Sequence, residues 1–440
     1  NRLLKVTEGA ESSGDVSGEI VGDSAETAEE ILAWYGYDAA GNVTSVIQPG
    51  STAAYTYNAN RQPVKAAYRF GASAENQTGL TVGNTVGKPV EVAVTMSENP
   101  VETFLAENFT YDAMGRITGS QRTGSRAEFA RTAAYAYDAV GRLISYQNGQ
   151  DLETYTYDAL GNRITRSLNG IQKAACQYNA LNQLTALSED GVTYSFGYDR
   201  CGSLTQERRG EDLVRQYVYD AAGRMTLGKN LESGEETAYT YNALQMCVKN
   251  VQKLAAEGGF RIREMQYVPD PLSATNNELM AYETGGDSIR TAFGHAYQRL
   301  AQTRTAGTPS LPDTASAGAQ FLSDSMNAGA GGAVLGKTFF QSDIYGSPIL
   351  EADGQGALQQ YAEYDVWGGL NVGTESWAGS GRRPEGTVLS GLEENLRFTS
   401  YRYDPVIGKY FAQARFYDSV NGRMLGKDPV KRGLNPYRYC

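Results

Sequence analysis

The chain contains few side chains of the kinds that build a metal centre or a catalytic triad. His295 is the only histidine among the 440 residues. The four cysteines, Cys176, Cys201, Cys247 and Cys440, form no CxxC pair. Structural zinc sites and redox motifs need closely spaced cysteines or histidines. We therefore expect no metal and no cofactor, and free thiols with one disulfide as the alternative.

A Gly-rich segment near residue 330 is the next candidate for chemistry. Residues 329–333 are followed by Gly336-Lys337-Thr338, which is similar to the end of a phosphate-binding loop. Such a loop also needs a strand directly ahead of its first glycine and a helix after it. The surrounding Ala/Gly/Ser/Thr-rich sequence predicts neither, so nucleotide binding is not expected.

The residues that recur most regularly are those of a tyrosine-aspartate motif. Tyr157-Asp158-Ala159-Leu160-Gly161 is one copy, and successive motifs between Tyr137 and Tyr241 lie 20, 21, 20, 21 and 22 residues apart. A fixed period of this size is typical of a repeat architecture. Other copies begin at Tyr37, Tyr111, Tyr178, Tyr198, Tyr219 and Tyr364.

Each repeat reads as two short strands and two turns. Residues 153–157 alternate and are rich in β-formers. Asp158 and Gly161 suit the first and fourth positions of a type I turn closed by a bulge, with Gly161 at positive φ. If so, Tyr157 lies opposite Arg163 and Tyr155 opposite Thr165. Asn169-Gly170 predicts a second hairpin turn.

Repetition of this unit predicts an all-β fold, a continuous antiparallel β-hairpin ribbon. Neither face carries a purely aliphatic stripe, and tyrosine can cover a sheet while its hydroxyl stays in water. We expect a single-layer sheet that curls into a partial hollow shell, open at its N-terminal side, with both faces partly solvated. A sheet this long must curl or close.

The charge balance excludes some partners. A net charge of −11 and a pI of about 4.9 disfavour nucleic acid and anionic membranes, because both attract basic surfaces. No apolar stretch approaches the ~20 residues of a membrane-spanning helix. The chain starts at Asn1 rather than Met, so we expect an internal fragment.

Motif density suggests four regions. Residues 1–33 form an acidic N-terminal extension, and residues 34–250 carry the repeats. Residues 251–336 read as degenerate repeats with an Ala/Gly/Ser-rich loop. Residues 337–440 hold two expanded motifs, at 403–408 and 417–422.

Here the residues resemble a known family. The array is similar to the YD repeats of Rhs proteins, teneurins and the shell components of insecticidal ABC toxins. The tail resembles the Rhs repeat-associated core domain in the order of five segments. These are residues 397–405, 414–418, 422–423, 428–429 and 435–439.

The resemblance implies a hollow β-shell around a C-terminal payload, often a toxin, closed by a core domain that cuts the chain behind itself as an aspartyl-type autoprotease. Asp428 matches the family's first aspartate and Arg415 its arginine, with Arg423 as a second candidate. The partner aspartate would lie beyond Cys440, so this chain is not expected to act as an independent enzyme. Asp428 could instead only cap a turn before Pro429.

These implications lead to two hypotheses for function. The first is a secreted or cell-surface structural shell of a polymorphic-toxin protein, whose partner is the payload segment of the same chain. The alternative is a cell-surface adhesion or carbohydrate-binding repeat protein, in which exposed tyrosines stack on sugars.

Overall fold

A computed structural model describes most of the chain and is almost entirely β-structure. Among the described residues the helices are two short 3-10 turns, η2 (Ala127–Phe129) and η4 (Phe398–Ser400). The described ranges are 5–8, 30–48, 51–70, 103–125, 127–269, 278–284, 289–295, 299–306, 334–353, 358–371, 397–428 and 434–439.

The main element is a ribbon of 26 strands, each hydrogen-bonded antiparallel to the next along the chain. We call this ribbon the wall. Its strands are β1 (Lys5–Glu8), β2 (Glu30–Tyr37), β3 (Val43–Gln48), β4 (Ser51–Tyr57), β5 (Pro63–Phe70), β6 (Thr103–Tyr111), β7 (Ile117–Gly124), β8 (Arg131–Tyr137), β9 (Leu143–Asn148), β10 (Asp151–Tyr157), β11 (Arg163–Leu168), β12 (Ile171–Tyr178), β13 (Leu184–Glu189), β14 (Val192–Tyr198), β15 (Leu204–Arg209), β16 (Asp212–Tyr219), β17 (Met225–Asn230), β18 (Glu235–Tyr241), β19 (Cys247–Ala256), β20 (Gly259–Pro269), β21 (Glu278–Thr284), β22 (Ile289–His295), β23 (Arg299–Ala306), β24 (Val334–Ser342), β25 (Pro348–Asp353) and β26 (Leu358–Tyr361). The predicted ribbon is confirmed.

The Tyr-Asp motif forms the turn between paired strands, as predicted. In the β10–β11 hairpin, Asp158 Oδ1 accepts hydrogen bonds from the backbone amides of Leu160 (2.9 Å) and Asn162 (2.8 Å). Gly161 closes the turn at φ +82°. The second predicted turn also forms, with Asn169 and Gly170 both at positive φ.

The predicted strand register is right at one position and wrong at the next. Tyr157 lies opposite Arg163, but Tyr155 lies opposite Arg166 and not Thr165. The register shifts between Thr156 and Tyr157. A bulge there places one extra residue on the return strand, so every pair beyond it moves by one.

Tyrosine hydroxyl groups connect successive repeats. Tyr157 Oη donates to the carbonyl of Leu143 at 2.6 Å, and Tyr178 Oη donates to that of Arg163 at 2.9 Å. Each acceptor lies beyond the last backbone pairs between the two hairpins, where a carbonyl still needs a donor. The expectation that these hydroxyls stay in water is therefore wrong. The same bond is made by Tyr57, Tyr111, Tyr137, Tyr241 and Tyr364.

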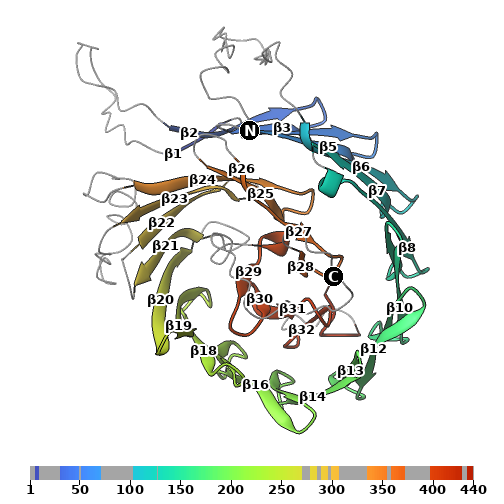
Figure 1. The fold of residues 1–440 in the computed structure, drawn as a ribbon, viewed down its shortest axis with the longest axis vertical. Coiled ribbons are helices and arrows are strands. Elements are labelled where there is room, and N and C mark those ends of the chain that lie inside the picture. Colours follow the sequence, from blue (N-terminus) through green and yellow to red (C-terminus); the bar gives the residue numbers. More distant parts are fainter. Residues whose placement is uncertain are drawn as a thin grey trace.

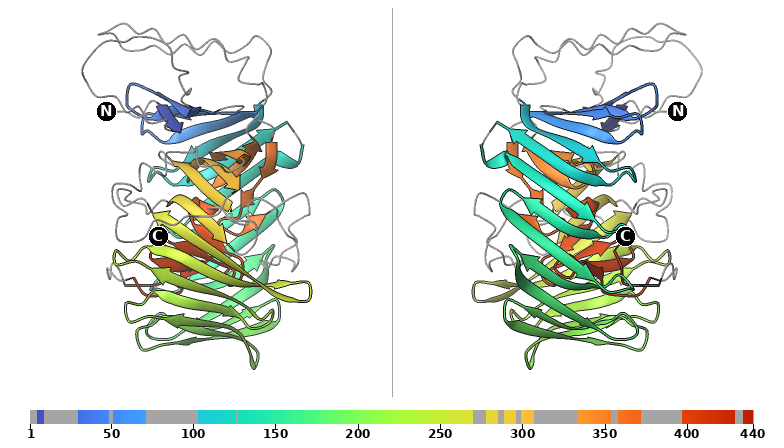
Figure 2. Two further views of the ribbon diagram at one scale, coloured as in Figure 1. Left: turned by 90° about the vertical axis from the view of Figure 1, so that its left-hand side faces the viewer. Right: turned by 90° about the vertical axis from the view of Figure 1, so that its right-hand side faces the viewer.

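The wall curls into a ring of about one turn, whose strands run at a tilt from one rim to the other (Figures 1 and 2). Its inner face is covered: Tyr155 is 3% exposed and Tyr217 is 2% exposed. Thr156, on the opposite face of its strand, is exposed. The expectation that both faces are partly solvated is thus wrong for the inner one, because the C-terminal part of the chain packs on it.

The two ends of the ribbon overlap instead of pairing. β24 lies against β4, and Tyr68 Oη donates to the Ser342 carbonyl at 2.9 Å. β1 and β26 are the two end strands of the sheet, so the wall is open in its hydrogen bonding, as expected for a partial shell. We call this overlap the seam.

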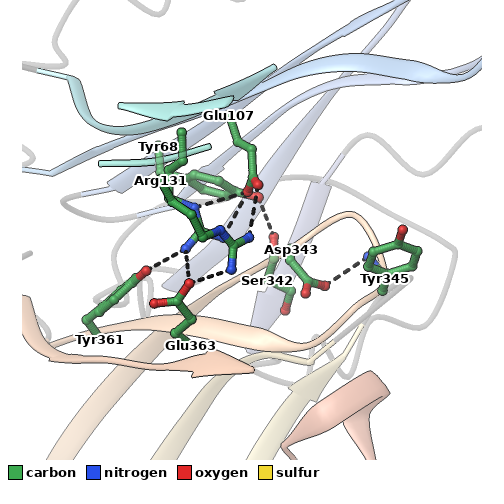
Figure 3. A network of polar contacts seen from close by, with 9 residues as sticks. Tyr68, Glu107, Arg131, Ser342, Asp343, Tyr345, Tyr361 and Glu363 are labelled. Carbon is green, nitrogen blue, oxygen red and sulfur yellow. Dashed lines mark hydrogen bonds and ion pairs between the residues drawn. The ribbon is translucent and has the colours of Figure 1, made fainter. Parts of the chain in front are cut away.

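A buried charge cluster joins the two sides of the seam (Figure 3). Arg122 lies 2.9 Å from Glu107 and 3.2 Å from Glu363. Arg131 lies 3.2 Å from Glu107 and 2.5 Å from Glu363. Glu107 belongs to β6, whereas Glu363 lies in β27 (Glu363–Tyr364), which pairs with β28 (Leu370–Asn371). The positive charges of the two arginines thus balance the negative charges of the two glutamates across the overlap.

The remaining sequence expectations concern single residues and segments. His295 is the last residue of β22. Cys176, Cys201 and Cys247 are free thiols. Most of the Ala/Gly/Ser-rich loop, residues 307–333, lies outside the described residues. Across the described ranges, no group of three or more potential metal ligands is found, and no helix has the length and apolar character to cross a bilayer.

Candidate functional site: the C-terminal segment inside the wall

Residues 397–428 and 434–439 lie within the ring formed by the wall (Figure 1), and we call them the plug. Its four-stranded sheet consists of β29 (Arg402–Asp404), β30 (Lys409–Ala412), β31 (Arg415–Asp418) and β32 (Arg423–Met424). Tyr410 and Tyr417, at 1% and 0% exposure, form its aromatic centre. Val406, Ile407 and Phe416 pack on wall residues such as Leu204 and Tyr217. The plug is therefore a packed part of the fold.

The first expanded motif places a buried aspartate against the wall. Asp404 Oδ1 accepts the backbone amide of Val406 at 2.9 Å, as the aspartates of the wall turns do. Its Oδ2 also accepts the hydroxyl of Tyr239 at 2.5 Å, and Thr237 Oγ1 lies 3.3 Å from Oδ1. Burial raises the pKa of Asp404 against these hydrogen bonds. The turn residue has thus become a link between plug and wall.

The second expanded motif contributes to a buried charge cluster. Lys409 Nζ lies 2.7 Å from Asp418 Oδ2 and 3.3 Å from Glu207 Oε1, which belongs to wall strand β15. Tyr217 Oη donates to the same Glu207 oxygen at 2.8 Å. Burial works to lower the pKa of Lys409, but the two carboxylates outweigh it and raise the pKa. Burial opposes ionisation of Asp418 as well, yet the charge of Lys409 keeps its pKa low.

The last described segment lies along the turns of the wall. Arg423 stacks between the rings of Tyr178 and Tyr437 and donates to the Asn182 carbonyl at 2.6 Å. Tyr437 Oη donates to the Gly202 carbonyl at 2.6 Å. Arg423, the second arginine candidate from the sequence, therefore anchors the plug to the wall.

The two predicted catalytic residues lie close together. Arg415 Nη2 is 3.8 Å from Asp428 Oδ2, and both side chains are partly exposed. The carbonyl of Pro436 accepts the backbone amide of Asp428 (2.9 Å) and Arg415 Nη1 (3.2 Å). The pair thus holds the final segment of the plug. A single carboxylate beside a guanidinium cannot by itself supply the acid and the base of an aspartyl protease.

The motif residues Tyr157, Asp158 and Gly161 lie in the wall and have a structural role. The guanidinium of Arg142, from the preceding motif, is 4.9 Å from the centre of the Tyr157 ring and donates to the Asp158 carbonyl at 2.7 Å. Arg116 and Arg224 stack in the same way on the next motif's tyrosine. The repeated motif is therefore a joint between hairpins.

Comparison with known proteins identifies the repeats. The family model for the teneurin YD-shell matches residues 73–246, and the RHS repeat model matches residues 37–73. Together these matches cover the part of the wall in which the Tyr-Asp turns follow one another. The chain therefore contains a teneurin-type YD-shell segment and an RHS repeat.

Curated relatives of this YD-repeat chain include two proteins named as toxins and one named as a nuclease. It is 24% identical over 346 residues to double-stranded DNA deaminase toxin A of Burkholderia cenocepacia, covering 76% of this chain and 21% of the relative. It is 24% identical over 368 residues to toxin protein Tse5 of Pseudomonas aeruginosa, covering 76% and 26%. For the tRNA3(Ser)-specific nuclease WapA of Bacillus spizizenii the identity is 25% over 301 residues, covering 67% and 10%. The chain thus spans between a tenth and about a quarter of these proteins.

Two solved structures align with most of this chain at low similarity. The crystal structure of TcdB2-TccC3 aligns with 92% of this chain and 21% of its own, with a TM-score of 0.40 and 15% identity. The Photorhabdus luminescens Tc holotoxin pore aligns with 94% and 24%, with a TM-score of 0.35 and 13% identity.

The sequence does not predict the buried contacts between the wall and the plug. Two of the residues involved, Asp404 and Asp418, lie in the expanded motifs, and this unusual spacing is a signal that could have singled them out. Glu207 and Lys409 carried no signal, because their meeting depends on where the plug sits along the wall.

Proposed function

We propose that this chain is part of the structural shell of a secreted polymorphic-toxin-type Rhs protein, and that the shell encloses a C-terminal payload of the same chain. The observation that carries the proposal is the buried inner face of the wall, on which the chain's own C-terminal segment packs. The toxins among its relatives support the same reading. Export from the cell follows from this proposal.

Enclosure can be tested by limited proteolysis of the full-length gene product. The payload should resist protease while the wall is folded, and should be digested once mild denaturant opens it. The separately expressed payload, digested under the same conditions, is the control. Equal digestion rates with and without the wall would contradict enclosure.

Self-cleavage of the full-length protein is the second part of the proposal. Asp428 would supply one carboxylate of an aspartyl pair, with the other from the segment that follows, and Arg415 would hold Asp428 by charge. The 3.8 Å contact of these side chains beside the last described segment supports these roles.

Intact mass and N-terminal sequencing of the full-length product test the cleavage. Wild type should yield two fragments that copurify, and Asp428→Ala should remain one chain. Asp138→Ala, which removes a wall turn carboxylate, is the matched control and should still be cut. Cleavage at the same bond in Asp428→Ala would disprove the catalytic role and leave enclosure standing.

The adhesion alternative receives less support from the wall. A sugar-stacking surface needs accessible rings, whereas the motif tyrosines direct their hydroxyls to backbone carbonyls and are stacked on by arginines. A glycan array that shows binding lost on substitution of wall tyrosines would restore this alternative.

A further inference from the structure

A lysine amine and two carboxyl groups meet inside the molecule where plug and wall touch. Lys409 lies on β30, and Asp418 ends the neighbouring strand β31. Nζ of Lys409 is 2.7 Å from Asp418 Oδ2 and 3.3 Å from Glu207 Oε1. The three side chains are 7%, 3% and 11% exposed, respectively. An amine thus stands at hydrogen-bonding distance from a carboxyl group in a place largely closed to water.

The surroundings of Asp418 are those of an activated carboxyl group. Its Oδ1 accepts the backbone amides of Val420 (3.0 Å) and Asn421 (3.3 Å), while Oδ2 accepts the amine of Lys409 (2.7 Å) and the side-chain amide of Asn421 (2.6 Å). Two fixed amide donors on one carboxyl oxygen stabilise the negative charge that develops there when a nucleophile adds to the carbon. Tyr217 holds Glu207 in place through a 2.8 Å hydrogen bond.

We propose that Lys409 and Asp418 become joined by an intramolecular amide bond, formed once in the folded chain, with Glu207 as the proton carrier. This assigns a covalent modification site to the plug. It is independent of the proposed shell function and of the Arg415–Asp428 pair.

The reaction is a condensation and needs no oxidant or co-reactant. The neutral amine of Lys409 adds to Cγ of the protonated Asp418 carboxyl, forming the Nζ–Cγ bond. Glu207 takes a proton from the nitrogen and delivers it to the departing hydroxyl. The Cγ–O bond breaks and one water leaves, so that one amine and one acid give one amide and one water.

The resting pair is ionic, and the reactive form differs from it only in the position of one proton. Moving that proton along the 2.7 Å bond from Nζ to Oδ2 yields the neutral amine and the neutral acid. Because buried ions are poorly solvated, the free energy of the neutral pair lies closer to that of the ionic pair than it would in water. Because each molecule must react only once, a small neutral population is enough. Exclusion of water then protects the product from hydrolysis.

Mass spectrometry of the 440-residue chain tests the proposal. The β-rich folded fraction, denatured before analysis, should be lighter than the sequence mass by one water. Trypsin should fail to cut after Lys409 and should release residues 403–415 joined to residues 416–423 as one branched peptide. The branched peptide is decisive, because an Asp-Gly step such as Asp190-Gly191 can also lose water by forming a cyclic imide.

Three variants separate the roles. Lys409→Arg keeps the positive charge but cannot form this amide, so its measured mass should equal the mass calculated from its sequence, with no water lost. Glu207→Gln should slow formation of the branched peptide by at least tenfold over a time course from synthesis. Lys249→Arg is the matched control, because Lys249 lies 2.8 Å from Glu264 in a more exposed pair, and it should leave the branched peptide unchanged. Recovery of two linear peptides at full yield from folded wild type would overturn the proposal.

Discussion

The Asp-x-x-Gly turn occurs in two settings, on the rim of the wall and in covered positions near the plug. On the rim, slight burial is outweighed by the backbone amide and the guanidinium of Arg142, which lower the pKa of Asp138. In the covered turn after β24, burial dominates and raises the pKa of Asp343 to about 6. Each aspartate accepts hydrogen bonds from the backbone amides of the residues two and four positions after it. The pKa of the turn aspartate is thus shifted in opposite directions, depending on what covers the turn.

The largest expected effect comes from removing the lysine amine of the plug. Lys409→Met leaves Asp418 and Glu207 as two buried carboxylates without the amine that faces them, whether that amine is a free cation or is joined to Asp418 as an amide. Breaking a buried pair in this way costs about 3–5 kcal/mol, measured as a loss in the free energy of unfolding in urea. Lys249→Met, in the partly exposed pair with Glu264, should cost only about 0–1 kcal/mol. Equal losses would mean that the plug cluster behaves as a surface pair.

Glycine substitutions compare the two settings at similar, left-handed backbone geometry. Gly161 (φ +82°) has open space around an added Cβ, whereas a Cβ on Gly422 (φ +64°) would lie 2.7 Å from the Trp367 ring. Gly161→Ala should cost about 1 kcal/mol for the left-handed backbone. Gly422→Ala adds a steric clash and should cost about 3 kcal/mol in total. Thermal unfolding of both variants measures the difference, and similar losses would show that the plug adjusts freely.

The pH dependence of stability should differ between the two settings. Because the pKa of Asp343 is raised in the folded state, its stabilising contribution is complete below pH 3.8 and is lost as pH rises through about 6. Asp343→Asn keeps the acceptor oxygen, so relative to wild type it should gain about 1–2 kcal/mol between pH 4.5 and pH 7.5.

Asp138→Asn is the control with the opposite sign. The lowered pKa of Asp138 contributes stability above about pH 4, so this variant should lose stability relative to wild type at neutral pH. Melting temperatures across the pH range measure both effects. Parallel curves for wild type and Asp343→Asn would disprove the burial argument.

The smallest expected effect concerns the tyrosine hydroxyls. Tyr157→Phe removes the hydrogen bond to the Leu143 carbonyl and should cost about 1 kcal/mol. The hydroxyl of Tyr219 is buried with no hydrogen-bond partner within the described part of the chain. Tyr219→Phe should therefore be neutral or slightly stabilising in the same urea titration. If both variants lost the same free energy, the hydroxyl bond would not be the reason.

The features that can be predicted from the sequence are those determined by residues close together in the chain. Asp158 and Gly161 determine their turn through neighbouring backbone amides and a positive φ, so the hairpins could be predicted from the sequence. The partner of Tyr155 could not, because it depends on which residue the bulge adds. The side-chain pairs across the seam, such as Arg131 and Glu363, join residues more than 200 positions apart.

The candidate site was reached by a different route. Arg415 and Asp428 were predicted from a family resemblance, and the structure places them 3.8 Å apart, while their catalytic role stays a prediction. Nothing in the spacing of residues could have paired Glu207 with Lys409, since that contact follows from the curvature of the whole ribbon.

The tyrosine bonds between repeats point in one direction along the chain. Each hydroxyl reaches back to a carbonyl of the hairpin before it, which leaves the ribosome earlier. During synthesis every new repeat therefore finds its acceptor already in place, and the wall can assemble from its N-terminal end as the chain emerges. The plug, made after the wall, arrives when the surface it must cover already exists.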